Sequence, residues 1–140
     1  VEGVPGRWEE IQGLARNALD ADAVRAAVAS GRYFRELFVS APINGALIEG
    51  FIDLLFEDEN GLTIVDYKTD DVDSEEDIDR ALDKYGSQMG AYAYAVQQAT
   101  GMPVRRAILL FLRPKREVVF DNIGLLISEA EGRASDLLKI

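Results

Sequence analysis

The sequence of 140 residues contains neither cysteine nor histidine. Without cysteine, the chain cannot form disulfides, zinc ribbons or a thiol nucleophile. Without histidine, it cannot form a serine–histidine triad or histidine-ligated zinc. Any metal bound by these residues must therefore be held by oxygen ligands, which favours magnesium, manganese or calcium.

Long apolar runs and a signal-peptide pattern are also missing, so we expect no membrane partner. A hydrophobic content of 48% and a charged content of 29% are typical of a single globular domain, here residues 1–140. The absence of cysteine fits a cytoplasmic protein. Because the chain begins at Val1 rather than at methionine, we expect it to be a fragment of a longer chain.

The net charge of −10 argues against a nucleic-acid partner, but the charges are unevenly distributed. Residues 70–79 hold seven of the 25 acidic residues, so the rest of the chain carries only −3. This acidic run lacks the glycine and the glutamate spacing of a calcium loop, which favours a solvated loop. Five basic residues and no acidic ones lie in the basic run, residues 105–116: Arg105, Arg106, Arg113, Lys115 and Arg116. On a strand they alternate faces, so about half of them could contact phosphates, with solubility as the alternative role.

Hydrophobic periodicity and turn residues predict a mixed α/β protein. The predicted elements are two helices over 7–29, a strand over 33–43 broken at Pro42, strands over 46–58 and 62–69, a helix over 74–100 with Gly86 as a candidate interruption, strands over 104–113 and 116–120, and a helix over 122–139. Asn60-Gly61 is the strongest hairpin signal, and it joins the two central strands.

This hairpin places three charged residues on one face. With Asn60 and Gly61 as the loop, Asp53 lies opposite Lys68, and Leu55 lies opposite Asp66. Because side chains alternate along a strand, Asp53, Asp66 and Lys68 all point to the same side. Ile52, Leu54, Phe56 and Val65 then form the back face of the hairpin.

Gathered carboxylates repel one another unless a divalent cation compensates them. A cation held by Asp53 and Asp66 would polarise a phosphodiester and lower the pKa of a bound water, while Lys68 stabilises the developing negative charge. Two alternatives remain open. The charges could decorate a solvated sheet face, or two carboxylates could hydrolyse sugars without a metal.

Three motifs resemble those of the PD-(D/E)XK nuclease superfamily: "GFID" (50–53), "VDYKT" (65–69) and "QMGAY" (88–92). Within it, the chain is most similar to RecB-like nuclease domains, such as those that end AddA-type helicase–nuclease subunits. The resemblance implies a restriction-endonuclease-like mixed sheet flanked by helices. It also implies N-terminal helices over 1–32, a catalytic core over 33–113, and a C-terminal strand and helix over 114–140.

The resemblance also implies site residues. Asp53 and Asp66 would be metal ligands with the carbonyl of Tyr67, and Lys68 would be the catalytic lysine. Gln88 and Tyr92 would orient the lysine or contact DNA. A segment similar to "YFRELFV" precedes the hairpin in these domains, which makes Glu36 a further candidate site residue.

The implied activity is DNA cleavage with Mg²⁺ or Mn²⁺, in a helicase–nuclease that processes double-strand breaks for recombinational repair. The implied partners are DNA, helicase domains in the same parent chain and a second helicase–nuclease subunit. One feature departs from the family: RecB-like nucleases usually have a metal-site histidine on an upstream helix, and this chain has none. An inactive module of the same fold, for DNA docking or for assembly with other subunits, is therefore the alternative.

Overall fold

A single five-stranded sheet organises the chain, which the computed structural model describes over residues 4–138, with side chains over residues 7–133. The elements are α1 (Val4–Asp20), α2 (Asp22–Ser30), β1 (Tyr33–Ile43), β2 (Ala46–Asp58), β3 (Gly61–Lys68), α3 (Glu75–Thr100), β4 (Val104–Phe111), β5 (Arg116–Phe120) and α4 (Ile123–Leu138). The strand order is β1-β2-β3-β4-β5. Strands β3 and β4 are parallel, and the other neighbours are antiparallel. The predicted α/β class, a mixed sheet flanked by helices, is confirmed.

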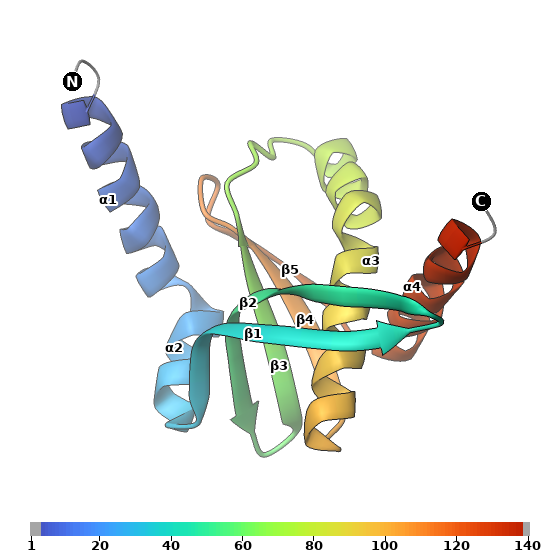
Figure 1. Ribbon diagram of the computed structural model, residues 1–140. Coiled ribbons are helices and arrows are strands. Elements are labelled where there is room, and N and C mark those ends of the chain that lie inside the picture. Colours follow the sequence, from blue (N-terminus) through green and yellow to red (C-terminus); the bar gives the residue numbers. More distant parts are fainter. Residues whose placement is uncertain (1–3, 139–140) are drawn as a thin grey trace.

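Helices cover both faces of the sheet (Figure 1). On one face, α2 packs its buried residues against alternate side chains of β2, β3 and β4, such as Leu54, Val65 and Ile108. On the other face, α3 and α4 cover the opposite set, such as Ile64 and Leu109. Because both faces of β3 are covered, its residues 62–66 are all buried, the pattern expected for a strand inside a sandwich. No helix among the described residues is long and apolar enough to cross a membrane.

The predicted hairpin of β2 and β3 is present, but its predicted register was wrong by two residues. Leu55 pairs with Ile64 rather than with Asp66, and Asp58 pairs with Gly61. Extending this register places Asp53 opposite Asp66, not opposite a lysine. Because a shift of two residues preserves the alternation of side chains, every residue keeps its predicted face at the site.

The turn explains the shift. Its two loop residues are Glu59 and Asn60, not Asn60 and Gly61. The side chain of Asp58 accepts a hydrogen bond from the backbone N–H of Asn60 at 2.8 Å, which is an Asx turn. Gly61 then enters β3 with a φ of 127°, a conformation that glycine adopts without strain.

Strand β2 bends midway and leaves β3 (Figure 1). Ile52 packs in the core under α3, whereas Leu54 packs in the core under α2, although the two have the same parity. The prediction that Ile52 shares the back face of Leu54 was therefore wrong. At the bend, the ladder between β1 and β2 skips Glu36 and Asp53, and Glu36 has a φ of 51°.

Two predicted breaks do not occur. Strand β1 continues through Pro42, because β1 is an edge strand where a missing N–H is tolerated. Helix α3 continues through Gly86 and ends at Gly101. It begins with a capping box, in which Ser74 and Asp77 each accept a hydrogen bond from the other's backbone.

The acidic run and the basic run are joined by ion pairs. Arg113 contacts Asp71 at 3.8 Å, and Arg116 contacts Glu75 at 3.0 Å. Part of the acidic run also begins α3, where negative charge favours the helix N-terminus. The acidic run is therefore only in part the solvated loop that the sequence suggested.

Candidate active site

The site begins where β2 separates from β3. Their ladder ends at Leu54 and Val65, so the next backbone N–H of β3 that faces β2, that of Tyr67, has lost its strand partner. The carboxylate of Asp53 replaces it and accepts this N–H through Oδ2 at 2.7 Å. The bend in β2 and the hydrogen bond to β3 together fix the position of Asp53.

Asp66 and Lys68 lie at the end of β3, on the face covered by α3. Only 7% of the Asp66 side chain and 14% of the Lys68 side chain are exposed. The ammonium of Lys68 lies 2.6 Å from Asp66 Oδ2. That same oxygen is buried and accepts no well-formed hydrogen bond, so one lone pair remains available in a site with little water.

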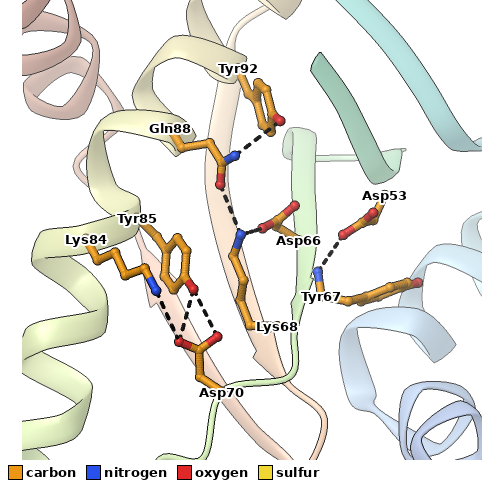
Figure 2. A network of polar contacts seen from close by, with 9 residues as sticks. All are labelled: Asp53, Asp66, Tyr67, Lys68, Asp70, Lys84, Tyr85, Gln88 and Tyr92. Atoms are coloured by element: carbon orange, nitrogen blue, oxygen red, sulfur yellow. Dashed lines mark hydrogen bonds and ion pairs between the residues drawn. The ribbon is translucent and has the colours of Figure 1, made fainter. Parts of the chain in front are cut away.

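The two carboxylates interact electrostatically, and Figure 2 shows them turned toward a common space. The pKa of Asp53 is raised to about 6, first by burial and further by the charge of Asp66. The N–H of Tyr67 and, more weakly, the ammonium of Lys68 oppose this rise. Near neutral pH, both aspartates can therefore ionise together only at a free-energy cost, which a bound cation would remove.

Helix α3 supplies the second side of the site. Gln88 accepts a hydrogen bond from Lys68 Nζ at 3.0 Å, and its Nε2 donates to the hydroxyl of Tyr92 at 3.3 Å (Figure 2). Burial raises the pKa of Tyr92, and the charges of Asp66 and then Asp53 raise it further. The structure thus brings together five of the residues singled out from the sequence, with Tyr67 beside them.

Glu36 is not gathered into this group. It is exposed and lies at the bend of β1, in the position that faces Asp53 across the ladder. The described residues contain no group of three or more acidic side chains placed to hold a metal ion. Glu36 is therefore not a third carboxylate of the site.

Two contacts at the site were not foreseen from the sequence. The ring of Tyr85 lies 3.9 Å from Lys68 Nζ, and the hydroxyl of Tyr85 donates to Asp70. The signal was present, because residues 85, 88 and 92 share one face of a helix. Gly50 was also overlooked: a Cβ on it would lie 2.6 Å from the Tyr92 hydroxyl.

The donor set fits a hard divalent cation. Two carboxylates, one with an unsatisfied buried oxygen and the other with a raised pKa, are oxygen ligands of the kind that Mg²⁺ and Mn²⁺ prefer. Mg²⁺ sites commonly use only one or two protein carboxylates and complete their coordination with water and phosphate oxygens. Asp53 and Asp66 are sufficient for such a site.

A family model for the PD-(D/E)XK nuclease superfamily matches residues 5–136. The chain belongs to this superfamily. The match includes every helix and strand of the structure in whole or in part, and all the site residues discussed above.

Several PD-(D/E)XK relatives are described as ATP-dependent helicase/nuclease subunits. The protein of Carboxydothermus hydrogenoformans is 40% identical over 72 residues, which is 51% of this chain and 6% of that protein. That of Clostridium kluyveri is 44% identical over 63 residues, 45% of this chain and 5% of its own. The matched part thus spans about a twentieth of these relatives. A crystal structure of SSO0001 covers 94% of this chain and 68% of its own at 15% identity, with a TM-score of 0.46, a likeness too distant to inform the site.

Proposed function

We propose that this chain is the nuclease domain of a helicase–nuclease and hydrolyses phosphodiester bonds of DNA with Mg²⁺ or Mn²⁺. The observation that carries the proposal is the pair of Asp53 and Asp66, with the buried ammonium of Lys68 2.6 Å from Asp66. A cation bound there would supply a Lewis acid for the phosphate and a water of lowered pKa.

The chain's own residues have separate roles in this proposal. Asp53 and Asp66 hold the cation, and the Tyr67 carbonyl completes the protein ligands. A strand residue directs its N–H and C=O to the same edge, and the N–H of Tyr67 already meets Asp53 at that edge. Lys68 provides positive charge for the pentacoordinate phosphate.

Helix α3 would keep the lysine in place. Gln88 accepts from Lys68 Nζ, and Tyr92 accepts from Gln88, so the helix holds the ammonium 3.0 Å from a neutral acceptor. A neutral acceptor orients the cation without cancelling its charge. Gln88 and Tyr92 would thus act through the lysine, with contacts to the DNA strand as a further role.

The wider role rests on the relatives' names. Since ATP-dependent helicase/nuclease subunits match here over 5–6% of their length, we place helicase domains in the same parent chain. The expected partner is a second helicase–nuclease subunit. Double-strand break processing for recombinational repair is the corresponding process. The cytoplasm is the expected location, because bacterial DNA is there.

The test is cleavage of linear DNA with Mg²⁺ by the wild-type chain and by Lys68→Ala, Asp66→Asn and Asp58→Asn. Asp58 lies at the far end of the same hairpin, about 17 Å from Asp53 along the strand, and serves as the control. We expect cleavage by the wild type and by the control, and a loss of about 10²–10³-fold in the other two. Calorimetry with Mn²⁺ should show binding that Asp66→Asn abolishes.

The absence of histidine from the sequence favours one other candidate, an inactive module of the same fold for DNA docking or for assembly with other subunits. This candidate expects DNA binding without cleavage by any of the four proteins. A metal-independent sugar hydrolase would instead show no heat with Mn²⁺. Either result would overturn the nuclease proposal.

A further inference from the structure

The ring of Tyr85 lies between two ammonium groups beside the site (Figure 2). Its centroid is 3.9 Å from Nζ of Lys68 and 4.9 Å from Nζ of Lys84. Lys68 is largely buried, whereas the side chain of Lys84 is 65% exposed. A cation–π contact is stronger when the cation is desolvated, so the contact with Lys68 is the more important one.

Asp70 fixes the orientation of this ring. The hydroxyl of Tyr85 lies 2.9 and 3.0 Å from the two oxygens of Asp70 and shares its proton between them. Asp70 also contacts Lys84 Nζ at 3.7 Å. Because Asp70 follows Lys68 by two residues, the same segment that carries the lysine also anchors the ring that faces it. A hydrogen bond to a carboxylate also adds electron density to the phenol, which strengthens its attraction for a cation.

Lys68 has three contacts of different kinds: Asp66 at 2.6 Å, Gln88 at 3.0 Å and the face of Tyr85. A divalent cation at the two aspartates would share the Asp66 carboxylate and repel the ammonium. The lysine would then depend on its two uncharged contacts. Of these, the ring covers the side of the ammonium that lies toward Asp70.

We propose that Tyr85, anchored by Asp70, is a positioning residue that holds the Lys68 ammonium at the site when a cation occupies the aspartates. This inference rests on the proposed nuclease function for its catalytic consequence, but the contact itself can be tested without activity. Tyr85 would not touch the substrate.

The contact is measured by NMR of the lysine ε-methylene groups, of which the sequence has four: Lys68, Lys84, Lys115 and Lys139. We expect strongly upfield-shifted ε protons that disappear in Lys68→Met and in Tyr85→Leu but remain in Tyr85→Phe. The shift should persist in saturating Mg²⁺. A wild-type spectrum without it, or its loss on adding Mg²⁺, overturns the proposal.

The consequence is measured as DNA cleavage with Mg²⁺. Tyr85→Leu should lower kcat by about 2- to 30-fold, the range that a cation–π contact is worth, with KM for DNA unchanged. Tyr85→Phe keeps the ring and should retain most of the activity. Tyr94→Leu is the control, because Tyr94 packs against the core about 13 Å further along α3.

A kcat for Tyr85→Leu equal to that of the control, or a loss in Tyr85→Phe as large as in Tyr85→Leu, overturns the role of the ring. If the wild-type chain does not cleave DNA at all, the nuclease proposal fails. In that case the ε-proton shift still decides whether Tyr85 holds Lys68.

Discussion

Asp53 should destabilise the folded chain at neutral pH, so Asp53→Asn should be more stable than the wild type. The pKa of this carboxyl is raised from 3.8 to about 6 in the folded state. The folded state therefore binds the proton more tightly than the unfolded state does. The destabilisation is absent below pH 3.8, grows as the pH rises from there to about 6, and is complete above pH 6.

A shift of about two pKa units corresponds to about 3 kcal/mol. Asp53 is only half-buried, so solvent screening reduces this figure, and we expect about 1–2 kcal/mol. Asparagine removes the charge and keeps an oxygen that can accept the Tyr67 N–H. The substitution should therefore keep the geometry and remove the repulsion from Asp66.

The assay is urea unfolding followed by circular dichroism at pH 4.0 and at pH 7.5 without metal. At pH 7.5, Asp53→Asn should exceed the wild type in free energy of unfolding by about 1–2 kcal/mol, and at pH 4.0 the two should be nearly equal. Asp58→Asn, at the turn of the same hairpin, should show no such gain. Mg²⁺ should stabilise the wild type but not Asp53→Asn. An Asp53→Asn protein no more stable than the wild type at pH 7.5 would refute the reasoning.

Two glycines give further predictions from close packing. A Cβ on Gly90 would clash with the carbonyl of Leu126, so Gly90→Ala should separate α3 from α4 and cost about 1–3 kcal/mol in urea unfolding. Gly132→Ala, where a Cβ meets nothing within 4 Å, should not destabilise the chain, and an equal loss there would contradict the packing explanation. Gly50→Ala should displace Tyr92 and slow DNA cleavage. Tyr92→Phe removes the closest atom of this contact, so the double variant should be more stable than Gly50→Ala alone, and no recovery would locate the strain elsewhere.

The types of all the helices and strands were predicted, because periodicity and turn residues report on local structure. The hairpin register was not, because Asn60-Gly61 is the stronger pattern on paper while the side chain of Asp58 selects a turn one residue earlier. The break at Pro42 was wrong for a similar reason. Only the sheet order, which depends on the whole chain, makes β1 an edge strand.

Within the site, the alternation of side chains was enough to place Asp53, Asp66 and Lys68 on one side, since a two-residue error preserves faces. The bend in β2 was not predictable from a pattern of alternating residues. It moves Ile52 to the other core and sets the distance between the aspartates. The contact of Tyr85 with Lys68 depends on how α3 lies across the sheet, which no local pattern specifies.

The gap between β2 and β3 has a consequence for how this site can be lost. A cation can be held only because two neighbouring strands stop zipping together one residue short of Tyr67, which leaves a carboxylate where a main-chain carbonyl would otherwise accept. Straightening β2 would let the ladder run on and fill that place with peptide groups. Every acidic side chain would still be present, and the metal would have nowhere to bind.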